Sequence, residues 1–298
     1  MLRSGAIKAP AKINLTLEVL APHADGYHGV RTVMLPVALY DELRWEGAER
    51  FSFYVEGAAP ADRSNLVLRA LAALELEPAC ALTLEKHIPA GGGLGGGSSD
   101  AAAVLRAAAS GAFGKLGARD YVGIARALGS DVPFFLVETG ALVEGTGERV
   151  TALGALPEWW LVLALLGVEV ATANAYKALD AARGGGYVPR PRNTSPSLLA
   201  IEAVQRGNFA DAIAAGTNDF EAVIAAREPA IASTLQSLRA AGARVAFLCG
   251  SGSSCAALAE TREEAETIAE RLKVPSGTEV RVVSLHHAES WRRERVSR

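Results

Sequence analysis

Apolar and polar residues alternate along one early stretch of the chain, residues 11–20. Every second residue there is apolar, which is typical of a β-strand with one face packed on a core. We therefore expect a half-buried strand whose apolar residues all point the same way. The residues between them should form a single polar face, made of Lys12, Asn14, Thr16 and Glu18.

Similar patterns predict further elements that alternate between strands and helices along the whole chain. Ser64 and Asn65 precede an apolar run and are expected to cap a helix that reaches about Leu76. This interleaving indicates an α/β or α+β protein, and breaker residues at 154–157 predict two domains, 1–155 and 156–298. The remaining strands are expected at 30–39, 51–55, 82–86, 141–144, 159–168, 244–248, 255–258 and 279–283, and the remaining helices at 100–110, 120–128, 173–182, 262–273 and in the segments leading to 241.

The composition is that of a globular protein, because 50% of the 298 residues are hydrophobic and 21% are charged. The formal net charge of −3 does not indicate a protein that binds nucleic acid, and it provides no general attraction to anionic membranes. A phosphate site must therefore be built locally, and the arginine cluster at 292–298 is expected to be a solvated tail.

The expected location of the protein is the cytoplasm. Its cysteines, Cys80, Cys249 and Cys255, have no metal-ligand spacing and their number is odd, which favours free thiols in a reducing compartment. The N-terminus has no pattern of a signal peptide. The most apolar run, 159–168, has about half the length needed to span a bilayer.

A glycine-rich segment is the strongest chemical signal in the chain. It holds six glycines between a predicted strand and a predicted helix. Glycines in such number cost backbone entropy, and close approach of the backbone to a ligand offsets that cost. Inward N–H groups and the start of the following helix favour an anion. The candidate phosphate-binding residues are Pro89, Ala90, Gly91, Gly92, Gly93, Leu94, Gly95, Gly96, Gly97, Ser98 and Ser99.

Two other phosphate-binding motifs are excluded for this segment, and a flexible linker is a less favoured alternative. Gly91, Gly93 and Gly96 match the dinucleotide-binding spacing, but no strand ending in an acidic residue follows about 20 residues later. The segment also approaches the P-loop pattern, but Ser98 occupies the position of the required lysine. A flexible linker would not be bounded so tightly by a strand and a helix.

The full run from Pro89 to Ala102 resembles the signature loop of the small-molecule kinase superfamily that contains galactokinase, homoserine kinase, mevalonate kinase and phosphomevalonate kinase. This resemblance implies an α+β fold with an N-terminal ribosomal-protein-S5-like domain and a C-terminal ferredoxin-like domain. It also implies that the loop wraps the phosphates of ATP, with Ser98 near Mg²⁺.

Other segments resemble one member of that superfamily, whose acceptor carries a cytidine diphosphate group. They are residues 10–17, 25–28, 129–134 and 192–194, and the glycine/serine turn at 250–254 resembles the superfamily's third motif. The resemblance implies that Lys12 and Asp131 form the catalytic pair. Taken alone, the pattern favours a solvated strand lysine for Lys12, and Asp131 could equally be the N-cap of a short helix that starts near Pro133.

The same resemblance assigns the acceptor site. Tyr27 and His28 are expected to recognise cytosine by stacking and by base-edge hydrogen bonds, and Tyr176 to cover the other face of the base. Asn14 and Thr172 complete the expected substrate-binding residues. We expect a small-molecule substrate, neither nucleic acid nor membrane as partner, and a monomer or a homodimer. The alternatives are another kinase of the superfamily, for homoserine or mevalonate, and a non-catalytic nucleotide or sugar sensor on the same scaffold.

Overall fold

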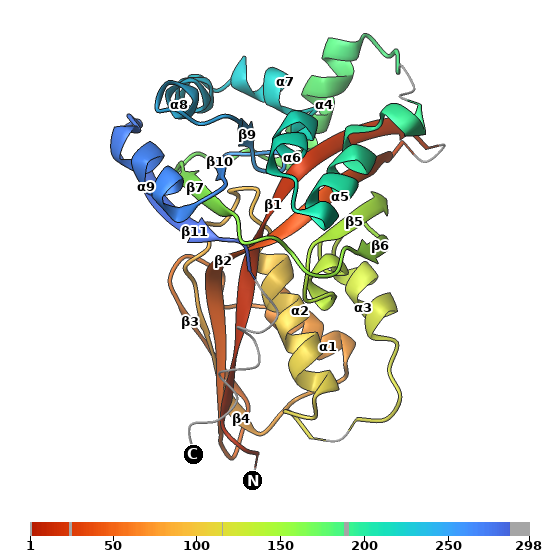
Figure 1. The fold of residues 1–298 in the computed structure, drawn as a ribbon. Helices are drawn as coiled ribbons and strands as arrows, with labels where there is room; N and C mark the ends of the chain where they lie inside the picture. The colour runs from red at the N-terminus through yellow and green to blue at the C-terminus, as the bar shows by residue number, and fades with distance from the viewer. Residues whose placement is uncertain (1, 24–25, 115, 188–190, 287–298) are drawn as a thin grey trace.

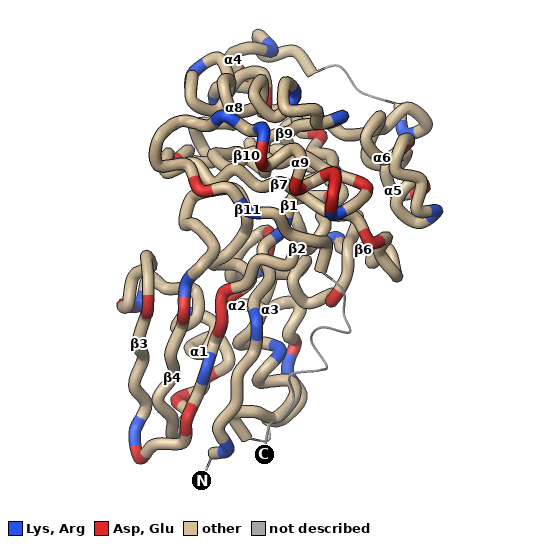
Figure 2. Tube along the Cα trace, turned by 60° about the vertical axis from the view of Figure 1, so that its left-hand side comes forward, with Lys and Arg blue, Asp and Glu red and all other residues tan. Residues whose placement is uncertain are grey.

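The computed structural model describes residues 2–23, 26–114, 116–187 and 191–286 (Figure 1). Two features of the sequence analysis lie outside these residues: Asp25 of the 25–28 segment, and the arginine cluster near the C-terminus. No helix in the described ranges is long and apolar enough to cross a membrane. Residues of both charge signs are interspersed over the elements (Figure 2).

A long antiparallel strand pair runs through the molecule and forms the centre of a seven-stranded sheet (Figure 1). These two strands, β1 and β2, are longer than predicted because their ends extend past the apolar segments. The sheet order is β3-β4-β2-β1-β8, and the hairpin β5–β6 pairs with β2 beyond the end of β4. The bounds are β1 Gly5–Pro22, β2 His28–Gly47, β3 Ser52–Glu56, β4 Cys80–Glu85, β5 Ala141–Gly145, β6 Arg149–Ala152 and β8 Thr217–Asn218.

Three helices cover one face of this sheet, namely α1 (Leu66–Ala73), α2 (Gly96–Ala109) and α3 (Tyr121–Leu128). The predicted cap of α1 is confirmed, since the side chain of Asn65 accepts a hydrogen bond from the amide of Val67 at 2.9 Å. Apolar residues of the sheet and the helices form a common core beneath α2, including Leu43, Leu82, Leu84, Val104 and Leu105.

A second, four-stranded antiparallel sheet has the order β11-β7-β10-β9. Helices α8 and α9 pack on it, and α4 lies near its edge beside α7 (Figure 1). The mixed α+β architecture is therefore confirmed. The bounds are β7 Trp160–Leu165, α4 Thr172–Arg183, α7 Glu221–Ala225, α8 Pro229–Ala240, β9 Ala246–Leu248, β10 Cys255–Ala259, α9 Arg262–Arg271 and β11 Glu279–Ser284.

Elements of the second half also join the first sheet. Helix α5 (Pro196–Arg206) packs on β1 and β2, α6 (Phe209–Ala215) follows it, and β8 pairs in parallel with β1. All strands of the second sheet come after the predicted boundary near residue 155. The first sheet is built mainly from residues before that boundary, but β8 comes after it. The division into 1–155 and 156–298 stays a prediction.

The predicted single polar face of β1 is wrong, because a bulge interrupts the strand. Asn14 lies opposite Met34 and Thr16 lies opposite Val33, so Leu15 is an extra residue. An extra residue reverses the alternation of side chains beyond it. Lys12 and Asn14 therefore line a cavity together with Leu17, and the far side of the strand receives Thr16 and Glu18. All four polar residues are buried, so the strand is not half-buried as predicted.

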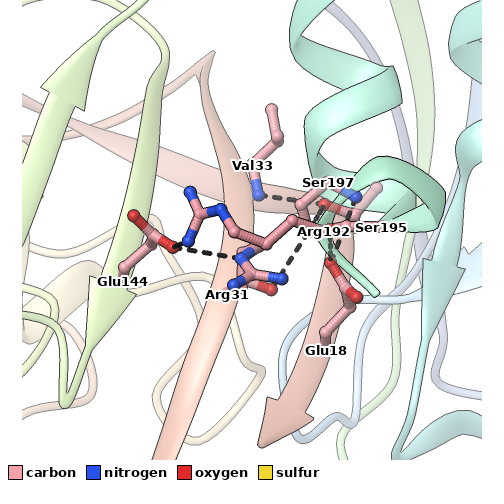
Figure 3. Close-up of polar contacts among 8 residues, drawn as sticks. Glu18, Arg31, Val33, Glu144, Arg192, Ser195 and Ser197 are labelled. Atoms are coloured by element: carbon pink, nitrogen blue, oxygen red, sulfur yellow. Dashed lines mark hydrogen bonds and ion pairs between the residues drawn. The ribbon is translucent and has the colours of Figure 1, made fainter. Parts of the chain in front are cut away.

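Polar contacts on that far side attach α5 to the central strands (Figure 3). The Glu18 carboxylate accepts hydrogen bonds from the hydroxyl of Ser195 at 2.6 Å and the amide of Ser197 at 3.2 Å. Nearby, the guanidinium of Arg31 donates to Glu144 at 3.0 Å, and Glu144 also pairs with Arg192. A buried carboxylate at the start of α5 stabilises the helix N-terminus. These contacts hold the back of the strands whose front lines the cavity.

Candidate active site

The glycine-rich segment connects β4 to α2, as predicted, but the helix begins earlier than expected. It starts at Gly96 instead of Asp100, and its N-cap is Gly95, which has φ = 73° and therefore offers no side-chain cap. The first amides of a helix have no partner within the helix, and they carry the positive end of its dipole. At α2 these amides belong to the glycine-rich segment and border the cavity, which suits a bound anion.

The segment is seated against the turn between β9 and β10, which is the glycine/serine turn found in the sequence. The amide of Ser254 donates to the carbonyl of Gly92 at 3.1 Å. Gly93 has φ = 75°, and a Cβ placed on it would lie 1.9 Å from the carbonyl oxygen of Cys249. Only glycine permits this approach of the two backbones. The glycine-rich segment and the glycine/serine turn are therefore in direct backbone contact.

Lys12 lies beneath the glycine-rich segment and is almost fully buried. Its ammonium donates to the side-chain oxygen of Asn14 and to the carbonyl of Gly93, both at 2.8 Å, and lies 3.5 Å from the carboxylate of Asp131. A buried lysine of this kind is not a solvated strand lysine, so that alternative is wrong. The structure brings Lys12 and Asn14 of β1 together with Asp131, which lies more than 100 residues later in the chain.

Asp131 follows α3 and does not cap the next helix. The 3-10 helix η1 (Phe134–Leu136) has Pro133 at its N-cap position and receives no side-chain hydrogen bond there. The alternative reading of Asp131 as an N-cap is therefore wrong. Its carboxylate is 31% exposed and faces the cavity opposite Lys12. An accessible carboxylate beside a buried cation can orient a hydroxyl group or accept its proton.

Aromatic side chains occupy another part of the same cavity. The rings of His28 and Tyr176 stack with their centroids 5.4 Å apart and their planes at 19°, and Tyr27 is 70% exposed. Burial, and to a lesser degree the charge of Asp131, raise the pKa of Tyr176 to about 12, so this ring stays a neutral phenol. Thr172, one turn before Tyr176, contacts the hydroxyl of Ser251 at 3.0 Å. The predicted aromatic residues are thus gathered, and His28 itself covers a face of Tyr176.

One cavity of about 920 Å³ connects these groups. It is bordered by most of the glycine-rich segment, by Lys12 and Asp131, and by the aromatic residues on α4 and at the start of β2. Ser99, which was predicted to bind phosphate, is a buried residue of α2 and is not among the residues that line the cavity. Several lining residues were not predicted to belong to a site: residues 58–60 and 64–66, from the connection after β3 to the first residue of α1, and Lys86, Lys177 and Asp180. Asp180 could have been found, since it follows Tyr176 by one helical turn.

A buried cluster of charges, made of Asp41, Lys86 and Asp100, lies under the glycine-rich segment. The ammonium of Lys86 contacts both carboxylates, at 2.7 Å in the case of Asp100. Asp41 also accepts hydrogen bonds from the amides of His87 and Ile88, at 2.6 and 2.8 Å. The cluster therefore ties β2, the end of β4 and the first turns of α2 to one another. It fixes both ends of the segment that we expect to hold the phosphates.

We expect Asp100→Asn to remove a pH dependence of stability. Burial raises the pKa of the Asp100 carboxyl to about 7, against the attraction of Lys86 and with the help of Asp41. The stability that the bound proton contributes is full below pH 3.8 and is lost as the pH rises to about 7. Urea unfolding of wild type should show the free energy of unfolding falling through this window by roughly 2–4 kcal/mol from this group. The variant should show a flatter profile; an unchanged profile would contradict the assignment.

Metal-ligating clusters are not found among the residues that the structure describes, where no group of three or more His, Cys, Asp or Glu could hold an ion. Ser98 and Asp131 both line the cavity. Hydroxyl, carboxylate and phosphate oxygens are the ligands that Mg²⁺ prefers. The donor set therefore fits a cation that arrives with a nucleotide, and it does not form a closed protein cage.

Two family models match the chain, and each of the matched ranges contains residues that line this cavity. The GHMP kinases N terminal domain matches residues 65–139, which include the glycine-rich segment and Asp131. The GHMP kinases C terminal domain matches residues 200–274, which include the turn at 250–254. The chain belongs to the GHMP kinases.

Within that family, the chain is similar to curated proteins that share one name. It is 39% identical over 89% of its length to the 4-diphosphocytidyl-2-C-methyl-D-erythritol kinase of Deinococcus radiodurans, covering 87% of that protein. It is also 39% identical over 90% of its length to the kinase of the same name from Symbiobacterium thermophilum, covering 95% of it.

The chain is also similar to solved structures of kinases. A crystal structure of 4-(cytidine 5'-diphospho)-2C-methyl-D-erythritol kinase matches 95% of this chain and all of its own, with 34% identity and a TM-score of 0.77. Homoserine kinase from Cytophaga hutchinsonii shares the fold, with a TM-score of 0.67 at 19% identity.

Proposed function

We propose that the protein is an ATP-dependent kinase that phosphorylates the 2-hydroxyl of 4-diphosphocytidyl-2-C-methyl-D-erythritol, giving the 2-phosphate and ADP, a step of non-mevalonate isoprenoid precursor biosynthesis. The observation that carries this proposal is the Lys12–Asp131 pair, 3.5 Å apart beside the glycine-rich segment. It supplies a carboxylate for the acceptor hydroxyl next to a site for phosphates. The similarity to the named kinases supports the choice of acceptor.

The residues have separate roles in this reaction. The amides of residues 91–98 and the N-terminus of α2 hold the phosphates of ATP. Asp131 orients the acceptor hydroxyl and takes its proton, while Lys12 stabilises the charge that develops on the transferring phosphoryl group. Asn14 accepts from Lys12 at 2.8 Å and donates to Thr32 at 2.8 Å, so it fixes the direction of the ammonium. Phosphoryl transfer depends mainly on such positioning and charge stabilisation.

Mg²⁺ would enter with ATP and would neutralise phosphate charge. Ser98 is the residue that we assign to it, since Ser98 stands in the glycine-rich segment and lines the cavity. The remaining ligands would be phosphate and water oxygens, which is how proteins commonly bind this ion.

We place two nucleoside groups in the cavity, each beside a different set of its lining residues. Tyr27, His28 and Tyr176 form the aromatic side, where we place the cytosine of the acceptor. Residues 58–60 and 64–66, from the connection after β3 to the first residue of α1, also border the cavity, and there we place the adenine of ATP.

Replacing Tyr176 by alanine should raise KM for the cytidine acceptor about 5- to 100-fold, because base–ring stacking is worth roughly 1–3 kcal/mol. KM for ATP should change little, since Tyr176 lies on α4 and not beside the proposed adenine site. Steady-state kinetics with each substrate varied in turn would measure both constants. Tyr176→Phe is the matched control and should stay close to wild type; an unchanged acceptor KM in Tyr176→Ala would contradict the stacking role.

A panel of acceptors distinguishes this function from its alternatives. ADP release should be observed with the cytidine diphosphate-linked acceptor and not with homoserine, mevalonate or CDP alone. Turnover of homoserine or mevalonate would indicate another kinase of the superfamily. Nucleotide binding without ADP release from any acceptor would indicate a non-catalytic sensor.

The cellular location that we propose is the cytoplasm. All three cysteines are free and buried in the structure, which supports a reducing compartment. Monomer and homodimer both remain compatible with the chain.

A further inference from the structure

Helix α4 presents three polar residues to the cavity along one stripe. Thr172, Tyr176 and Asp180 are spaced by four, so they lie above one another on the same face of the helix, and all three line the cavity. The first two were expected from the sequence. Asp180 extends the same face by one turn, to the place where the His28 ring meets α4.

Asp180 is in direct contact with the ring that we expect at the base. The Nε2 atom of His28 lies 3.1 Å from one carboxylate oxygen of Asp180 and 3.2 Å from the other. The His28 side chain is nearly buried, whereas the Asp180 side chain is 50% exposed. The carboxylate can therefore move at little cost while the ring stays in place.

The other ring nitrogen of His28 also has a defined hydrogen-bond partner. Its Nδ1 atom lies 2.9 Å from the carbonyl oxygen of Leu20, which can only accept a hydrogen bond. An N–H at Nδ1 is the group that suits this carbonyl. A carboxylate also only accepts, so an N–H at Nε2 is the group that suits the contact with Asp180. Both ring nitrogens thus face acceptors, and of these the Asp180 carboxylate belongs to a residue that lines the cavity.

We propose that Asp180 is a specificity-determining residue that reads the base of the acceptor together with His28. Side by side, the two groups offer an N–H donor and a carboxylate acceptor. Cytosine has the complementary edge, with N3 as an acceptor next to an amino group that donates, and carboxylates pair with that amino group. Uracil has the opposite pattern, a donor at N3 next to a carbonyl oxygen. The pair therefore accepts cytosine and rejects uracil.

This inference rests on the proposed function, because it concerns the acceptor of that reaction. Cytosine would replace one His28–Asp180 contact by two hydrogen bonds, from Nε2–H to N3 and from the amino group to the carboxylate. Uracil would place donor against donor and acceptor against acceptor. Each such position discriminates between bases on the order of 10- to 100-fold.

The test compares two acceptors, the cytidine diphosphate-linked substrate and its uridine diphosphate-linked analogue, with wild type and Asp180→Asn. An amide offers a donor where the carboxylate accepted, and without the negative charge His28 can present the Nε2 lone pair. Asp180→Asn should therefore shift the ratio of kcat/KM for cytidine over uridine toward uridine by about 10- to 100-fold, mainly through KM. Asp180→Ala should weaken the preference without reversing the hydrogen-bond pattern.

Controls separate this inference from the function on which it rests. Glu270→Gln, which changes an exposed carboxylate on α9, should leave the ratio at its wild-type value. Melting temperatures should be similar for all variants, so that a folding defect is recognised. If wild type phosphorylates the cytidine acceptor and the ratio in Asp180→Asn stays within about twofold of wild type, the role of Asp180 is refuted and the kinase function stands. If wild type phosphorylates neither acceptor, the proposed function itself fails.

Discussion

Asp131→Asn should lower kcat by about 10³-fold while the protein stays folded. A positioned acid or base contributes typically 10²–10⁴-fold to a rate. The amide keeps the size of the side chain but cannot accept the hydroxyl proton, and it no longer carries the charge that faces Lys12. Lys12 itself would remain held by Asn14 and by the carbonyl of Gly93. We therefore expect ATP to bind the variant with nearly normal affinity.

The measurement is single-turnover and steady-state ADP formation with the cytidine acceptor, with ATP affinity determined separately by calorimetry. Asp120→Asn is a matched control, because Asp120 is a nearby exposed carboxylate that caps α3 through the amide of Gly123. Asparagine also caps helices, so this control should be as active as wild type. Near-normal turnover in Asp131→Asn would refute the catalytic role of Asp131.

Gly93→Ala should have the second large effect, a loss of both stability and activity. A side chain at φ = 75° costs roughly 1–2 kcal/mol. In addition, its Cβ would lie 1.9 Å from the Cys249 carbonyl, so the glycine-rich segment and the 250–254 turn would have to separate. The amides of the segment would then leave the positions that hold phosphate. We expect KM for ATP to rise and kcat to fall, with kcat/KM reduced more than 100-fold, and a lower melting temperature.

Gly185→Ala is the control that separates the effect of backbone strain from the effect of the steric clash with the Cys249 carbonyl. Gly185 has the same φ of 75°, but a Cβ there would meet nothing within 4 Å. This control should show the modest loss of stability that comes from the backbone alone, with normal kinetics for ATP. If Gly93→Ala showed the same small loss of stability and the same normal kinetics for ATP as Gly185→Ala, the close contact between the glycine-rich segment and the 250–254 turn would not be needed for activity.

Local patterns predicted the strand, the glycine-rich segment and the helix around the phosphate site, because these depend on residues that are neighbours in the chain. The helix start was misplaced, since Gly96 and Gly97 are poor helix formers. Packing outweighs the low helix propensity of these glycines. A Cβ added at Gly96 would lie 3.0 Å from the Ile88 side chain and 3.2 Å from the Asp41 carboxylate, so the space at this helix start suits glycine.

Features that depend on distant segments could not be predicted in this way. The bulge at Leu15 follows from the register between β1 and β2, which alternation within one strand does not contain. The Asp41–Lys86–Asp100 cluster joins three elements and needs the sheet order to be known. The proposed catalytic pair was predicted through the resemblance to a kinase superfamily, since the strand pattern alone favoured a solvated position for Lys12.

Identification of the phosphorylated product tests the central claim most directly. The protein would be incubated with ATP, Mg²⁺ and 4-diphosphocytidyl-2-C-methyl-D-erythritol, and the product followed by ³¹P NMR and mass spectrometry. We predict one new phosphomonoester at the 2-position, an intact diphosphate, and one ADP formed for each product molecule. ADP formed without this phosphomonoester, or faster phosphorylation of homoserine or mevalonate than of this acceptor, would contradict the assignment.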